Sequence, residues 1–409
     1  MRKILRWGSS VVALGVLGAI LVKRALRVPR RLAPVPRELV TRAVIPGIPG
    51  ARHLVGVGIE SLIQDVVAAR QREEDFLARS GHTGPLPPAD ILALSGGGDN
   101  GAFGAGLLCG WSDSGDRPNF KCVTGVSTGG LIAPLAFLGK EYDQMLKTIF
   151  TSVTPAHIAI KRTILAAINN DGMADNRPLW DLISRSIDQT LLSRIAEEHR
   201  KGRILLIGTT NLDARQPVIW NMGTIAASGD PKALDLCRAI LLASAAIPGA
   251  FPPSMVPVKV DGTPYEEMHV DGGASAQVFL YPPSLRAVAH SMGLEITRPG
   301  RVYVVRNSML TASEAKTIER QTISIAQRAI NSLIHTQGLG DLYRIYMTTT
   351  RDGFDFNLAY IGPDFMYENK KEEFDTLYMR ALFDYAYNLG RHGSPWRKTP
   401  PGVETALGL

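Results

Sequence analysis

One turn in the chain has the residue types and spacing of a nucleophilic serine. Ser127 lies in Gly125-Val126-Ser127-Thr128-Gly129, after one apolar run and before another. A G-x-S-x-G turn between a strand and a helix holds a serine hydroxyl above the sheet, because its glycines let the chain turn sharply. We therefore interpret Ser127 as the candidate nucleophile, with Gly125 and Gly129 supporting the turn.

A second glycine-rich turn, residues 96–101, precedes the first by about thirty residues. Its spacing also fits a dinucleotide-binding loop, but that site needs an acidic residue at the end of the next strand. The predicted strand 120–124 ends without one. An oxyanion hole made of backbone N–H groups is the functional interpretation that remains, beside a simple tight turn. The candidate donors are Gly96, Gly97, Gly98 and Gly101.

A serine nucleophile needs a base. Asp271 follows a short predicted strand, 268–270, and precedes Gly272 and Gly273, so a sharp turn can aim its carboxylate at the edge of the sheet. A simple Asp-Gly turn is the alternative, and His269 is a lesser candidate base. A Ser-His-Asp site would need a histidine further on, and the chain offers His290, His335 and His392, each in a context typical of a surface residue.

Apolar runs and helix patterns alternate along the chain, which predicts an α/β fold with a mostly parallel sheet between helices. The main predicted strands are 91–94, 120–124, 203–210, 218–221, 268–270, 301–305 and 355–361. The main predicted helices are 59–77, 102–111, 131–138, 142–150, 175–187, 233–246, 312–336 and 372–389.

The first 52 residues carry most of the positive charge. They contain eleven Lys and Arg and one acid, whereas the remainder has a net charge of −3. The uncharged run 7–22 would form a helix of about 24 Å, which basic flanks can extend toward the ~30 Å of a bilayer core. We expect an uncleaved membrane anchor, in the envelope of a bacterium. A cleaved signal peptide ranks second and a helix packed on the domain third.

Other site classes find little support in the sequence. The three cysteines show no C-x-x-C spacing, and we find no metal-ligand set and no cofactor site. The positive charge is confined to the N-terminal arm, so we expect a membrane surface as partner and no nucleic acid.

Taken together, the Gly-Gly-Gly-x-x-Gly turn, the G-x-S-x-G turn and the distant Asp-Gly-Gly resemble the patatin-like phospholipases. The stretches 208–213 and 243–253 also look like that family. The resemblance implies Ser127 as nucleophile, Asp271 as its direct base without a histidine, and an oxyanion hole chiefly from Gly97 and Gly98. The family usually has an acid before the glycines and Arg or Lys before the last one. This chain has Ser95 and Asn100 there.

We therefore expect a three-layer α/β sandwich, patatin-like, that follows an N-terminal apolar helix. The expected division is an anchor or uncleaved signal at 1–27, a linker and surface helix at 28–88, a catalytic domain at 89–285, and an extension of the same domain at 286–409. The expected activity is hydrolysis of lipid esters through an acyl-enzyme. A Ser-His-Asp esterase and a catalytically silent, membrane-tethered binding protein are the alternatives.

Overall fold

The computed structural model describes residues 31–56, 58–163, 170–294, 298–310, 320–368, 370–393 and 395–403. The predicted anchor at 1–27 lies outside these residues. Within them, no helix combines the length and the hydropathy needed to cross a bilayer.

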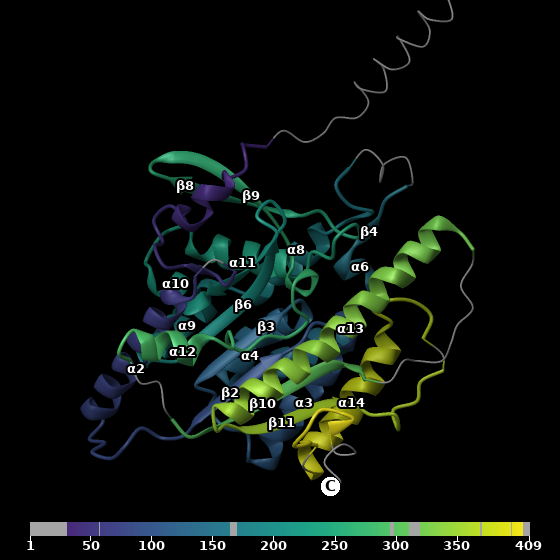
Figure 1. The fold of residues 1–409 in the computed structure, drawn as a ribbon. Coiled ribbons are helices and arrows are strands. Elements are labelled where there is room, and N and C mark those ends of the chain that lie inside the picture. The colour runs from purple at the N-terminus through teal and green to yellow at the C-terminus, as the bar shows by residue number, and fades with distance from the viewer. Residues whose placement is uncertain are drawn as a thin grey trace, which may run out of the picture.

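A nine-stranded sheet forms the centre of the described molecule (Figure 1). Its main path is β1-β7-β6-β3-β2-β10-β11, and every neighbouring pair from β6 to β11 on this path is parallel. Strands β1, β7, β8 and β9 join it in antiparallel pairs. The fold is therefore mixed α/β with a largely parallel central sheet, as predicted.

The strands of this sheet are β1 (Arg52–Leu54), β2 (Ala89–Leu94), β3 (Cys122–Val126), β6 (Ile204–Asn211), β7 (Gln216–Asn221), β8 (Ser254–Val260), β9 (Thr263–Asp271), β10 (Gly300–Met309) and β11 (Asp355–Ile361). A separate hairpin pairs β4 (Ile160–Lys161) with β5 (Ala174–Asp175). The helices are α2 (Glu60–Arg79), α3 (Gly101–Ser114), α4 (Thr128–Leu138), α5 (Asp143–Ser152), α6 (Pro155–Ile158), α8 (Arg177–Ser186), α9 (Gln189–Arg200), α10 (Met222–Ala227), α11 (Ala233–Ser244), α12 (Leu285–Ser291), α13 (Thr322–Arg351) and α14 (Thr376–His392).

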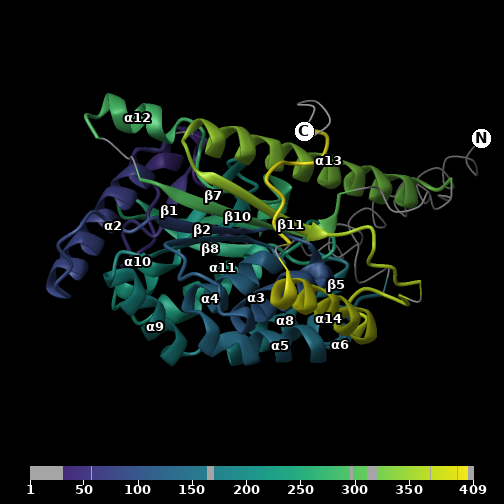
Figure 2. The same cartoon turned by 90° about the horizontal axis from the view of Figure 1, so that it is seen from below.

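The two faces of the sheet are covered differently (Figure 2). One face carries α3, α4, α11 and α14 and shares a single continuous hydrophobic core with them, because alternate strand residues such as Leu92 and Leu94 point to that side. The opposite face carries α2, α12 and α13. Its apolar residues form two separate clusters, one with Ile91 under α13 and one with Ile204 under α2 and α12.

Two segments differ from their sequence-based expectation. Residues 31–50 fall in the predicted linker, yet Val40 and Ile48 are buried in the main core and Val44 pairs with Lys259. The helix predicted at 312–336 runs instead from Thr322 to Arg351, and residues 311–319 lie outside the described residues. The extension after residue 286 supplies β10 and β11, which continue the parallel sheet beyond β2.

Candidate active site

Ser127 occupies a strained turn between β3 and α4. Its φ of 55° and ψ of −127° lie in a region that residues with a side chain rarely adopt. The turn needs its glycines: a Cβ on Gly125 would come 2.4 Å from the Gly129 carbonyl oxygen, and a Cβ on Gly129 would come 2.4 Å from that of Leu94. The predicted sharp strand-to-helix turn is therefore present, and it packs directly against the end of β2.

Strand pairing brings Asp271 to the same place. Strand β3 pairs with residues 204–208 of β6, and β9 then pairs with residues 209–211. Because β7 occupies the other edge of β6, β3 and β9 share one edge and meet end to end. Ser127 follows the last residue of β3, and Asp271 is the last residue of β9. Two motifs 144 positions apart thus converge on one point.

The Ser127 side chain lies close enough to the Asp271 carboxylate to lower the pKa of that group. That carboxylate accepts the N–H of Gly273 on Oδ1 at 2.7 Å. Burial raises the pKa of Asp271 to about 6, although the Ser127 side chain and the Gly273 N–H oppose the rise. Asp271 is only 5% exposed and Ser127 8%. At neutral pH the carboxylate is mostly ionised, yet its proton affinity is higher than that of an exposed aspartate.

Ser244, the last residue of α11, supports the turn at Ser127 with two hydrogen bonds. Its Oγ accepts the N–H of Ser127 at 2.9 Å and donates to the Gly208 carbonyl oxygen at 2.8 Å. The side chain is fully buried. No motif of the sequence predicts a role for Ser244. The only sequence feature that points to it is its position within 243–253, the stretch that resembles the patatin-like phospholipases.

The glycine turn at 96–101 lies against Ser127, since a Cβ on Gly96 would come 3.2 Å from the Cβ of Ser127. Two of its four candidate N–H donors are already engaged. Gly96 donates to the Gln277 carbonyl oxygen at 3.0 Å, and Gly101 donates within the turn to Gly98. Among the described residues, no backbone carbonyl accepts the N–H of Gly97 or Gly98. Those two groups remain as candidate oxyanion donors.

Asn307, in the part of β10 that extends beyond its pairing with β2, ties this turn to the sheet. Its Nδ2 donates to the Ser95 carbonyl oxygen at 2.8 Å, its N–H donates to the Ser95 hydroxyl at 2.8 Å, and its Oδ1 accepts the Gly104 N–H at 3.0 Å. Ser95 stands where the family usually has an acid. Its hydroxyl and its carbonyl oxygen both take part in hydrogen bonds between uncharged groups. A Cβ on Gly97 would come 2.2 Å from the Asn307 carbonyl oxygen, so close packing fixes this part of the turn.

The C-terminal segment holds the other side of the turn. Lys370 pairs with Asp99 at 2.7 Å, and the Phe374 N–H donates to the same carboxylate oxygen at 2.9 Å. Tyr378 donates its hydroxyl to the Asn100 side chain at 2.6 Å. Asn100, which stands where the family usually has Arg or Lys, thus contributes a neutral contact.

No histidine hydrogen-bonds Ser127 or Asp271, and all eight histidines lie within the described residues. His269, the lesser candidate, is fully buried and bonds Thr209 at 2.9 Å and Glu267 at 3.1 Å. Burial lowers its pKa, which Glu267 partly opposes. His290, His335 and His392 lie on α12, α13 and α14 and make no such contact.

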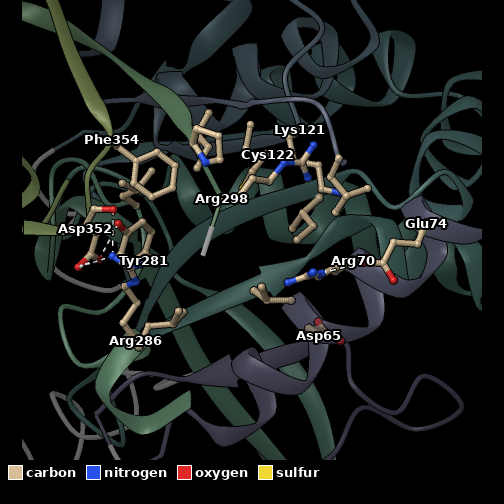
Figure 3. A pocket seen from close by; sticks show the side chains of 18 of the residues that line it. Asp65, Arg70, Glu74, Lys121, Cys122, Tyr281, Arg286, Arg298, Asp352 and Phe354 are labelled. Atoms are coloured by element: carbon tan, nitrogen blue, oxygen red, sulfur yellow. Dashed lines mark hydrogen bonds and ion pairs between the residues drawn. The ribbon is translucent and has the colours of Figure 1, made fainter. Parts of the chain in front are cut away.

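A cavity of about 580 Å³ lies at the amino-terminal ends of the parallel strands, away from Ser127 (Figure 3). Its walls include Ala89, Cys122 and Ile204, the first residues of β2, β3 and β6. Strand β3 separates it from the serine by five residues, about 16 Å. In the described ranges no group of three or more His, Cys, Asp or Glu residues is arranged to hold a metal ion.

The family model for the patatin-like phospholipases matches residues 92–282. The chain contains a patatin-like phospholipase domain. This domain begins inside β2, contains both glycine turns and Asp271, and ends just after the Gln277 segment.

Among solved structures, VipD from Legionella pneumophila is similar at 12% sequence identity with a TM-score of 0.31. The match covers 74% of this chain and 65% of VipD, so this chain spans less than two thirds of that protein. The comparison with curated proteins gives no match.

Proposed function

We propose that this protein is a lipid acyl hydrolase that cleaves fatty-acyl esters with a Ser127–Asp271 dyad. The convergence of the Ser127 side chain and the Asp271 carboxylate at the meeting ends of β3 and β9 carries the proposal, because it places a nucleophile beside a base inside a patatin-like phospholipase domain. The strained backbone at Ser127 supports it, since strain of this kind concentrates at functional sites.

In the proposed reaction the Ser127 oxygen attacks the ester carbonyl carbon while Asp271 accepts the serine proton. The carbonyl oxygen becomes an oxyanion, which the N–H groups of Gly97 and Gly98 stabilise. The tetrahedral intermediate collapses, the C–O bond to the alcohol breaks, and Asp271 returns its proton to the leaving oxygen. Water then attacks the acyl-serine with Asp271 again as base, which releases the fatty acid and restores Ser127.

The elements around the site favour a lipid as substrate. The start of α13, the β4–β5 hairpin region and the loop after β11 carry exposed apolar side chains. Hydrogen bonds join α13 to the loop after Asp271, the segment before β5 to the loop after α11, and the 366–374 loop to the glycine turn. An exposed apolar rim of this kind suits contact with a lipid surface. Its residues are Ile160, Met173, Ile325, Ile330, Leu333 and Met366.

Residues 1–27 would hold the protein at a membrane. The charge and apolar run of that segment support this proposal, and the envelope of a bacterium is the proposed location. The anchor would concentrate the enzyme on the surface where its lipid substrate resides.

Fluorophosphonate labelling combined with ester hydrolysis tests the proposed function. The wild-type protein should be labelled on Ser127 and should hydrolyse a short dispersed ester, whereas Ser127→Ala should lose labelling and lose turnover by about 10⁴-fold or more. Ser308→Ala, also near the end of the sheet but outside the dyad, is the matched control. An unlabelled wild-type protein would favour the silent binding protein. Labelling that survives in Ser127→Ala would place the nucleophile elsewhere.

A further inference from the structure

The cavity at the amino-terminal ends of the strands is a gap in one covering layer of the sheet. On that face, α13 covers one hydrophobic cluster, and α2 with α12 covers the other. The cavity lies between them: Ile91 and Phe354 come from the first side, and Leu62 and Leu206 from the second. Figure 3 shows the labelled charged side chains around this space. The sheet therefore presents an uncovered apolar floor at this point.

The buried polar side chains of the cavity lining all have hydrogen-bond partners within the described residues. Glu73 binds Arg298 through both guanidinium nitrogens at 2.6 and 2.9 Å and binds Lys121 at 2.6 Å. Tyr281 donates its hydroxyl to Asp352 at 2.9 Å. Among the described residues, none of the buried side-chain atoms that lack a hydrogen-bond partner belongs to the cavity lining. Water would find few partners inside, and an apolar guest would cost no buried polar group.

Size and lining together define the class of guest. A volume of about 580 Å³ falls within the range of small-molecule sites, which are mostly apolar with a few polar groups at fixed points. The charged side chains of the lining are each paired with another side chain, and Arg286 among them is about a third exposed: its Nη1 donates to the Asp352 carbonyl oxygen at 2.9 Å and lies 3.7 Å from the Asp352 carboxylate. An apolar chain inside with a charged head beside Arg286 matches this arrangement.

We propose that this cavity binds the hydrocarbon chain of a single-chain amphiphile, specifically a long-chain fatty acid, with the carboxylate beside Arg286. The choice of a fatty acid rests on the proposed function, because the proposed reaction releases a fatty acid. The existence of an apolar binding site does not rest on that function. Because the cavity and Ser127 lie at opposite ends of β3, the guest occupies a site separate from the reacting ester.

Binding of cis-parinaric acid, a fluorescent long-chain fatty acid, to the full-length Ser127→Ala protein tests the proposal. This background removes turnover, so the result does not depend on whether the dyad is catalytic. We expect saturable binding that dodecanoate displaces. Val66→Trp and Leu77→Trp place an indole in the cavity from the partly exposed side of α2 and should each weaken binding at least tenfold.

Val67→Trp is the matched control, because Val67 is the next residue of the same helix, is equally half-buried and does not line the cavity. It should bind as the Ser127→Ala parent does. Thermal unfolding identifies a variant that fails to fold. If either Val66→Trp or Leu77→Trp fails to fold, binding by the other one tests the proposal. Unchanged binding in a folded filling variant would place the fatty acid elsewhere, for example in the site at Ser127. Absence of saturable binding in the parent would also overturn the proposal, whereas ester hydrolysis by the wild-type protein would stand.

Discussion

At its carboxyl end β3 runs into a turn in which nearly every polar group has a fixed partner, and at its amino end it opens onto an apolar cavity. Ser127 at the first end is strained, held by Ser244 and adjacent to Asp271. Cys122 at the second end is half-buried, and burial raises its thiol pKa to about 12, so it acts as part of an inert wall. The proposed reaction requires side chains held in fixed positions, whereas an apolar chain requires an open cavity. The five residues of β3 separate the site of the first from the site of the second.

The largest expected effect is at the carboxyl end. Asp271→Asn should lower turnover by about 10³- to 10⁴-fold, since the dyad acts as a unit. The same change should stabilise the protein at neutral pH. The folded-state pKa near 6 exceeds the ordinary 3.8, so ionised Asp271 costs up to about 3 kcal/mol above pH 6, and this cost disappears below pH 4. Denaturation of both proteins at pH 4 and pH 7.5 measures the difference. If the difference in stability between Asp271→Asn and the wild-type protein were the same at pH 4 and pH 7.5, the raised pKa would be contradicted.

A smaller loss is expected at the support of the glycine turn. Asn307→Ala leaves the Ser95 carbonyl and the Gly104 N–H without their partner, which should displace Gly97 and Gly98 and lower kcat by about 10- to 100-fold. Steady-state kinetics on a dispersed ester measure the change.

Asn357→Ala is the control for this variant. Asn357 is also a buried asparagine of the sheet, but its side chain bonds to β10, to β11 and to Lys398, and not to the turn. It should reduce stability and leave kcat nearly unchanged. Equal kcat losses in the two variants would mean that general destabilisation, and not displacement of the turn, causes the effect.

Histidine substitutions should affect stability more than catalysis. His269→Gln disrupts a buried network with Thr209 and Glu267 and should cost about 1–3 kcal/mol in the free energy of unfolding, with kcat changed less than tenfold. Single alanine substitutions of His290, His335 and His392 should leave both quantities nearly unchanged. If a folded variant of any of the four lost turnover as completely as Ser127→Ala, a triad would have to replace the dyad.

The smallest effect on chemistry is expected from removing the predicted anchor. A protein that begins at Arg31 keeps the ion pair of that residue with Asp213 and the buried residues Val40 and Ile48. It should hydrolyse a dispersed ester at the full rate and should lose activity on lipid vesicles, because the anchor no longer concentrates it there. Membrane fractionation with a high-salt wash measures the difference. Retention of the shortened protein in the pellet would assign membrane binding to another surface, such as the apolar rim.

Local patterns predicted the order of the elements well. Strand β11 has the predicted bounds, and β2, β3 and β6 lie within two residues of theirs. Helix α13 begins later than predicted and continues past residue 336 to Arg351, through Gly338 and Gly340. In the structure Gly338 serves packing, since a Cβ there would come 2.3 Å from the Arg306 guanidinium. Strands β1, β4, β5 and β8 were missed, as were helices α6, α9, α10 and α12. Strand β1 is only three residues long and pairs with the distant strand β7.

The candidate site also contains residues that the sequence predicts and residues that it does not. Ser127 and Asp271 stand out because each occupies a short glycine-rich motif, whose chemistry is readable in a few residues. Ser244, Gln277 and Asn307 support those motifs through contacts that span 36 to 212 positions. Hydrogen bonds of that range leave no periodicity or spacing in the sequence. They depend on strand order, which the structure provides.

The pH dependence of serine acylation tests the central claim most directly. Fluorophosphonate labels Ser127 in a single step, so its rate reports the base that activates the serine. With Asp271 as that base, the rate for the wild-type protein should rise through a single ionisation near pH 6, the pKa of Asp271. In Asp271→Asn the rate should be low and without that ionisation. An unchanged ionisation in Asp271→Asn would show that another group activates Ser127, and the dyad would be refuted.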